Sequence, residues 1–168
     1  QAGGGGNDQG RFVAKAGQSN IVAYGFFSGT STFGSDQHTS TSDSGSTVGT
    51  GSNRDLFISL LDEDGHWQWT KTAGGSNGYG DEPGGLAVDS QSNIYIAGSF
   101  VGDITLGSFS FTGDGNFDGF IAKLTPEGSW AFANHIGGNY NQEPMQLSIH
   151  NDDGVIVYGE YTRQAVFD

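Results

Sequence analysis

Residues 81–100 read DEPGGLAVDSQSNIYIAGSF, and this stretch decides the fold because two similar segments occur in the chain. The earlier segment is NDQGRFVAKAGQSNIVAYGF at 7–26, and the later one is NQEPMQLSIHNDDGVIVYGEY at 141–161. A repeat of about this length, built from short apolar runs and glycine turns, predicts small repeated β-sheets. Each segment has a glycine near its end, and these glycines are spaced by 73 and 61 residues: Gly25, Gly98 and Gly159.

The composition agrees with a repeat protein built from strands. The chain has 168 residues, of which 34% are hydrophobic, and its 30 glycines against 3 prolines indicate many tight turns. The absence of a Gly-X-Y period and of a long helical pattern excludes collagen and coiled coils. The chain has no cysteine, which excludes a disulfide framework, and it has no apolar run near twenty residues, so we expect no membrane insertion.

The net charge is strongly negative, at −13 from 19 acidic and 6 basic residues. This charge would repel nucleic acid and anionic membrane surfaces, so we expect no nucleic-acid partner. The simplest interpretation is a well-solvated exterior, and the alternative is recruitment of cations or basic partners.

Each repeat is predicted to form four antiparallel strands. Runs such as 94–97 are apolar at nearly every position, which is typical of a sheet covered on both faces. Turns with Gly65 and Gly128 follow the third strand, where glycine supplies the positive φ of a tight hairpin. The expected strands are 12–16, 21–26, 55–61 and 66–72 in the first repeat, 86–89, 93–99, 118–124 and 129–135 in the second, and 146–150 and 155–161 in the third.

Radial repetition of four-stranded sheets is the β-propeller plan, so we predict an all-β segment of about two and a half blades. Because a closed ring typically has four to eight blades, we expect a portion of a larger propeller or a chain completed by partners. The first four residues resemble residues 72–75, which indicates a start partway through a unit. The predicted domain is 1–168, with repeat 1 at about 7–75, repeat 2 at about 80–138 and a partial repeat 3 at about 141–168.

The Ser/Thr-rich segment 28–53 is predicted to be a surface loop. Gly34 and Asp55 are 21 residues apart, against 11 for Gly107 and Asp118 in the second repeat, so the first repeat has about ten extra residues. Within this segment, Ser35 to Gly51 is the best candidate for a variable contact loop, and a mobile linker is the favoured alternative.

Aromatic residues recur at matching places on the fourth strand. Trp69 and Phe132 are expected core positions, because burying such a ring removes roughly 150–250 Å² of surface from water. Trp67 and Trp130 recur beside them. Their repetition favours packing between blades over the alternative, an aromatic platform for sugars.

No catalytic, cofactor-binding or metal-ligating residue is assigned. Nothing in the sequence resembles a Ser-His-Asp set, and the glycine-rich segments lack the lysine of a phosphate loop. The histidines have no recognised metal-binding spacing and are expected to be ordinary surface or edge residues: His38, His66, His135 and His150.

Three acidic turns have the residue types that could hold a cation: 62–65, 114–119 and 151–154. Only 114–119 opens like a calcium loop, and its closing glutamate would fall on Thr125. A plain turn is therefore favoured, with calcium as the alternative. The Asn-x-Asp segments 53–55 and 116–118 each begin a strand, where these side chains are expected to accept backbone N–H bonds.

The chain resembles the bacterial β-propeller repeat proteins called SBBP repeats, especially versions in secreted and surface proteins of Bacteroidota. The resemblance covers nearly all of the chain outside the Ser/Thr-rich segment. The third copy departs from it, with His150 in place of Asp89 and Tyr158 in place of Ala97. The matching residues are DLFI at 55–58, WTKTAGG at 69–75, GLAVDS at 85–90, NIYIAGSFVG at 93–102 and DGFIAKL at 118–124.

This resemblance implies an extracellular or cell-surface bacterial protein, commonly exported by the type IX secretion route, without shared catalytic residues. We therefore expect a non-catalytic scaffold or binding module without a cofactor, and not an enzyme. Its partner would be an unknown protein or glycan, or an outer-membrane secretion or surface complex. The alternative is a carbohydrate-binding or enzyme-associated propeller whose site lies in blades outside this segment.

Overall fold

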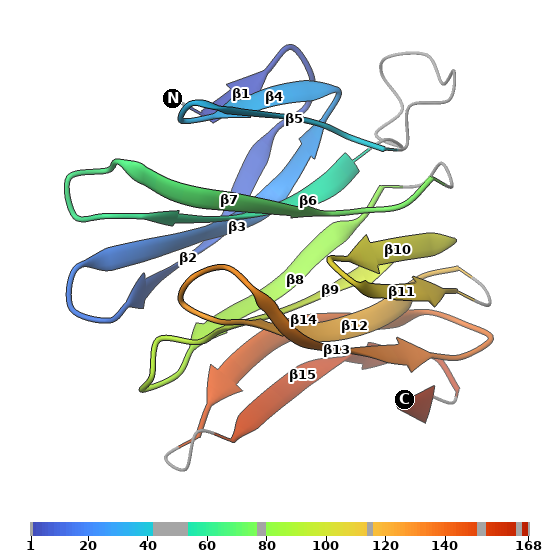
Figure 1. Ribbon diagram of the computed structural model, residues 1–168. Coiled ribbons are helices and arrows are strands. Elements are labelled where there is room, and N and C mark those ends of the chain that lie inside the picture. The colour runs from blue at the N-terminus through green and yellow to red at the C-terminus, as the bar shows by residue number, and fades with distance from the viewer. Residues whose placement is uncertain are drawn as a thin grey trace.

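The computed structural model describes residues 2–41, 54–76, 80–113, 116–150, 154–163 and 166–167 (Figure 1). This part of the chain consists of strands and the turns between them, so the all-β prediction is confirmed. Within the described residues, no helix is long and apolar enough to cross a membrane.

The predicted four-stranded blades are present in the first two repeats. The first sheet has the order β2-β3-β6-β7. The second has the order β8-β9-β12-β13 with β16 (Val166–Phe167) added beside β13, and β14 pairs with β15 in the third repeat. All ten predicted strands are found. Their bounds are β2 (Gln9–Ala16), β3 (Asn20–Ser28), β6 (Arg54–Leu61), β7 (Trp67–Ala73), β8 (Glu82–Val88), β9 (Ile94–Phe100), β12 (Asp118–Leu124), β13 (Trp130–Gly137), β14 (Gln142–Ile149) and β15 (Val155–Tyr161).

The first strand of each repeat begins earlier than predicted because a β-bulge interrupts it. A bulge breaks the alternation of side chains between the two faces, so the apolar pattern that predicts a strand is regular only after it. The bulges recur with the spacing of the repeats, which supports the alignment of the three segments. The extra residues are Arg11, Gly84 and Met145.

The prediction of a surface loop is wrong for residues 30–39. They form a hairpin of β4 (Thr30–Phe33) and β5 (Asp36–Thr39), and the second repeat has its counterpart in β10 (Asp103–Leu106) and β11 (Phe109–Thr112). Gly34 and Gly107 make the two turns, each with a φ of 65°, which glycine adopts without strain. The ten extra residues follow β5, and positions 42–53 lie outside the described residues.

The β10–β11 hairpin is bridged to the chain at the end of β7, the fourth strand of the first blade, and we call this pairing the blade clasp. Between the first two repeats, the N–H of Thr105 donates to the carbonyl of Gly74 at 2.9 Å. β1 (Ala2–Gly4) pairs with β4, and β16 (Val166–Phe167) pairs with β13, in the same relative positions. The matching bridges are Gly3–Thr32, Gly74–Thr105 and Gly137–Val166.

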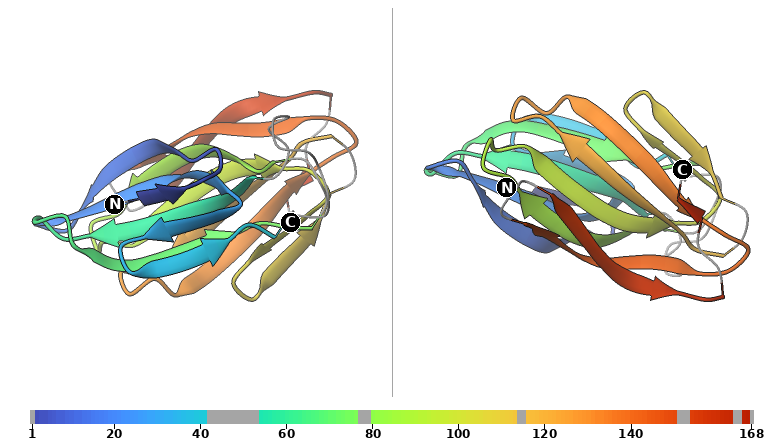
Figure 2. Two further views of the ribbon diagram at one scale, coloured as in Figure 1. Left: turned by 90° about the horizontal axis from the view of Figure 1, so that it is seen from above. Right: turned by 90° about the horizontal axis from the view of Figure 1, so that it is seen from below.

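The first two blades share one hydrophobic core, and a second cluster lies between the second blade and β14–β15. Ile94 and Tyr95 are neighbours on β9 and belong to different clusters, with exposed fractions of 0% and 5%. The second blade is therefore covered on both faces, as its continuous apolar runs predict. Both views of Figure 2 show the strands of the three repeats running side by side in layers.

Two aromatic side chains of the first blade donate hydrogen bonds to the second blade. The buried Tyr24 hydroxyl donates to the carbonyl of Ala97 at 3.1 Å, and the indole N–H of Trp69 donates to the carbonyl of Pro126 at 3.0 Å. Burial, and then the charge of Asp81, raises the pKa of Tyr24, so its hydroxyl keeps the proton that it donates. Both aromatic residues thus pack with apolar neighbours and satisfy their polar atom.

Candidate functional site

The two ends of the blades carry different structures. The turn end has the tight turns that follow β2, β6, β8 and β12 (Figure 1, left). The hairpin end has β4–β5, β10–β11 and the connections between repeats. Because binding residues are often placed on loops above a rigid framework, both ends are candidate binding surfaces.

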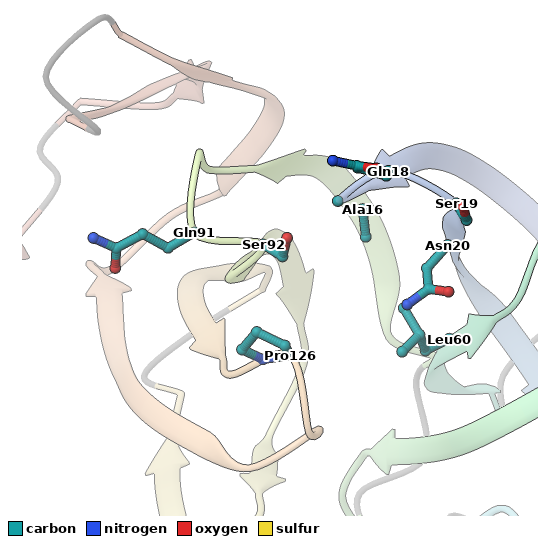
Figure 3. Close-up of a pocket in the computed structure, with 9 residues that line it drawn as sticks. Ala16, Gln18, Ser19, Asn20, Leu60, Gln91, Ser92 and Pro126 are labelled. Carbon is teal, nitrogen blue, oxygen red and sulfur yellow. The ribbon is translucent and has the colours of Figure 1, made fainter.

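A pocket of about 320 Å³ lies at the turn end, between the first two repeats (Figure 3). This volume is near the lower limit for small-molecule sites. The buried side chains of Ala16 and Leu60 give the pocket an apolar side. Amide and hydroxyl side chains form much of the rest, and no charged residue lines it among the described residues. Its polar lining is Gln18, Ser19, Asn20, Gln91 and Ser92.

The same tripeptide, Gln-Ser-Asn, stands on both sides of this pocket, at 18–20 and at 91–93. In the second repeat, Asp89 holds the tripeptide in place. Its carboxylate accepts the N–H of Gln91 at 3.0 Å, the N–H of Asn93 at 2.8 Å and the side-chain amide of Asn93 at 2.8 Å. Burial opposes ionisation, but these hydrogen bonds outweigh it and lower the pKa of Asp89.

In the first repeat, Ala16 stands in place of Asp89. Asn20 therefore lacks the carboxylate that binds Asn93, and its side-chain amide makes no hydrogen bond within the described part of the chain. In Figure 3 this amide points into the pocket, with Ser92 and Pro126 on the opposite side and the Gln91 side chain directed away. The pocket thus contains an unused amide beside an apolar surface.

The turn at 62–66 carries a group of acidic and histidine side chains. Ligand atoms of Asp62, Asp64 and His66 lie within 4.8 Å of one another, and Asp64 and His66 are exposed. The N–H of His66 donates to Asp62 at 2.8 Å and that of Asp64 donates at 3.1 Å. The backbone hydrogen bond from His66 is the main cause that lowers the pKa of Asp62. These are the bonds of an acid-stabilised turn.

The other acidic turns are only partly described. Residues 114–115 and 151–153 lie outside the described residues, so the alternative of calcium at 114–119 stays open. Most of the candidate contact loop at 35–51 also lies outside them. Asp118, at the end of the first turn, is buried and its Oδ2 lies 3.0 Å from Nε2 of His135.

Two further acids are buried at the hairpin end. Asp55 accepts the N–H of Thr41 at 2.8 Å and its hydroxyl at 3.0 Å, which confirms the predicted backbone bond. Its other oxygen is buried without a hydrogen bond among the described residues. Burial raises the pKa of Asp55 to about 6, and burial together with the charge of Asp55 raises the pKa of Asp81. Glu82, beside Asp81, pairs with the guanidinium of Arg54.

The expectation of surface or edge histidines is wrong for His135. Besides its contact with Asp118, the ring stacks on Phe111 with centroids 5.6 Å apart, and its side chain is 14% exposed. His66 and His150 are exposed as predicted, and His38 lies half-buried beside Phe33. The hairpin that provides Phe111 was not predicted, so this stacking partner of His135 was not predicted either.

Trp67 and Trp130 are packed against the additional hairpins. Trp67 contacts Gly34 and stacks edge-on with Phe33 at 5.9 Å, and Trp130 contacts Gly107. Trp130 also borders the core shared by the two blades, as the prediction of packing between blades requires, whereas the described contacts of Trp67 lie within its own repeat. Half-buried rings held in this way do not form an open platform for sugars.

The comparison with protein families agrees with this fold. Residues 68–99 match the family model described as SBBP: Beta-propeller repeat. The match runs from β7 through the β8–β9 turn to β9, so it includes Gly74 of the blade clasp and Ser92 of the pocket. It supports the SBBP-type propeller repeat that the sequence resembles. No curated protein matches the chain.

Proposed function

We propose that the chain is a non-catalytic propeller scaffold that binds a partner through the turn end of its blades. The observation that carries the proposal is the fixed geometry of this end. Asp62 and Asp89 each hold a turn by two backbone hydrogen bonds, directly above blades that share a packed core. Turns that are ordered before binding lose little conformational freedom when a partner arrives, which favours recognition.

The same proposal places the protein outside the cell or on the bacterial surface, exported by the type IX route. Its support is the SBBP resemblance together with the acidic, well-solvated composition. Added protease should degrade the protein in intact cells of the source organism, while a cytoplasmic marker stays intact. Degradation only after lysis would contradict this placement, and export that continues after inactivation of the type IX machinery would contradict the route.

The binding role is tested by immobilising the purified chain and probing it with glycan and peptide libraries. Saturable binding without chemical change of the ligand is expected. A variant with Asp89→Ala should bind more weakly, because the turn at 89–93 loses its hydrogen bonds, whereas exposed Asp36→Ala at the hairpin end should bind normally. Conversion of many ligand molecules per protein molecule would instead show an enzyme.

A further inference from the structure

The pocket at the turn end has the lining of a site for an uncharged, hydroxyl-rich ligand. We infer that it binds one ring of a neutral sugar between the Gln-Ser-Asn turns of the first two repeats. This inference rests on the proposed function as a binding module, and it adds the position and the chemical class of the ligand.

The strongest argument is the difference between Asn20 and Asn93. Asn93 gives its side-chain amide to Asp89, but Asn20 has Ala16 at the matching position and keeps its amide unbonded among the described residues. An amide offers two donors and one acceptor, which matches the adjacent hydroxyls of a sugar. Because the first repeat has alanine where the second has aspartate, the side-chain amide of Asn20 is left available to a ligand.

The apolar side of the pocket suits the C–H groups on the faces of a sugar ring. Ala16 and Leu60 are buried at 3% and 6% exposure and offer carbon surface next to the Asn20 amide. A pyranose has C–H groups on its faces and hydroxyls on its rim, so it can contact both at once. Across the gap, the backbone of Ser92 is held at a φ of 66° by the turn at Asp89, and its hydroxyl is a second polar group on the pocket wall.

Charged ligands fit this pocket less well. None of its lining residues is acidic or basic, and the net charge of −13 disfavours anions. For a cation, the nearest carboxylate on the turn is Asp89, and both of its oxygens already accept hydrogen bonds. A neutral ligand needs no counter-charge and is therefore the chemical class that remains.

The test uses the full ¹⁵N-labelled chain and methyl glycosides of glucose, galactose, mannose and N-acetylglucosamine as probes. Saturable NMR shifts are expected at the Asn20 side-chain amide and the Ser92 N–H for at least one glycoside. The dissociation constant should be on the order of 1 mM, as expected for a ligand of this size at ordinary efficiency. Methyl galacturonate should bind more weakly than its neutral counterpart.

Asn20→Ala should weaken binding about tenfold, the effect of one hydrogen bond. It should leave the fold intact, since the Asn20 side chain holds no described residue. The matched control is Asn134→Ala on the exposed face of β13, which should bind like the original chain. The inference is overturned if none of the four glycosides shifts the NMR signals of Asn20 and Ser92. It is also overturned if the Asn20→Ala variant binds a glycoside as tightly as the original chain. Absence of sugar binding with retained binding in the library experiment would overturn only this inference, whereas hydrolysis of a glycoside would contradict the proposed function.

Discussion

At the scale of single residues, the buried carboxyls of the hairpin end are the groups most sensitive to pH. Folding raises the pKa of Asp55 from 3.8 to about 6 and raises that of Asp81 in the same direction. A raised pKa means that the folded state binds the proton more tightly than the unfolded state. The stabilising contribution of protonated Asp55 is therefore complete below pH 3.8 and is lost as pH rises through about 6.

We predict that the free energy of unfolding decreases between about pH 4 and pH 6, the interval between the unfolded and folded pKa values of Asp55, and that Asp55→Asn reduces this decrease. Asparagine keeps the shape of the side chain without the charge, so the variant should be more stable at pH 7.5 by up to roughly 3 kcal/mol. Urea unfolding at a series of pH values measures the effect. The exposed Asp36→Asn should follow the original profile, and an unchanged slope in the Asp55 variant would contradict the assignment.

The Tyr24 hydroxyl provides a second prediction. Tyr24→Phe removes the bond to Ala97 that joins the first two blades and should lower the free energy of unfolding by about 1 kcal/mol. Tyr158 occupies the matching position in the third repeat and is 64% exposed, so Tyr158→Phe should change it by less than about 0.5 kcal/mol. Equal losses in the two variants, measured by urea unfolding, would show that the cross-blade bond contributes nothing.

These residues also show what could be predicted from the sequence. The repeat alignment located Asp55 at a strand start, and its backbone hydrogen bond follows from that place. The alignment did not single out Asn20 as a binding residue. The only signal is a difference between the repeats, because position 16 is alanine where the matching position 89 is aspartate. Comparing the two Gln-Ser-Asn turns residue by residue would have revealed it. Phe111, which stacks on His135, lies in a hairpin that was not predicted.

At the scale of elements, the strands with continuous apolar residues were predicted and the small hairpins were not. A strand such as β9 is buried on both faces, so burial itself produces the signal in the sequence. β4 and β10 are only four residues long and carry Thr and Asp on the outward side, which resembles a loop. Their other side is buried through Phe33, Ile104 and Leu106. Four residues are too few for this alternation to be distinguished from chance.

The blade clasp gives the prediction at this scale. A Cβ atom on Gly75 would overlap the backbone carbonyl of Asp103, so Gly75→Ala should push the second hairpin away from β7. Such overpacking typically costs about 1–3 kcal/mol. Amide hydrogen exchange should show faster exchange at Thr105, whose N–H bonds to Gly74.

Gly10→Ala is the matched control for this substitution. Gly10 lies in a strand with open space around its Cβ position, and its φ is not positive. The variant should retain both stability and the protection of Thr105, since alanine restricts the unfolded chain more than glycine does. If Gly75→Ala leaves the exchange of Thr105 unchanged, the clasp does not hold the hairpin.

At the scale of the whole molecule, the packed sheets stabilise the fold and the excess of negative charge destabilises it. The blades are held by apolar cores that salt affects little, whereas 19 acidic residues against 6 basic ones repel one another across the surface. The described ion pairs are few, and the more exposed ones, such as Arg11 with Glu82 at 3.9 Å, are expected to contribute little. Repulsion is therefore the larger electrostatic effect on stability near pH 7.

Added salt should consequently stabilise the chain. Raising NaCl from 0.01 M to 1 M shortens the screening length from about 30 Å to about 3 Å, which suppresses repulsion between distant carboxylates. We expect the unfolding temperature at pH 7.5 to rise by several degrees, measured by calorimetry. At pH 4.3, near the isoelectric point, the net charge is close to zero and the same salt should have a much smaller effect. An equal rise at both pH values would indicate a general effect of salt on apolar burial, and a fall at pH 7.5 would show that ion pairs outweigh the repulsion.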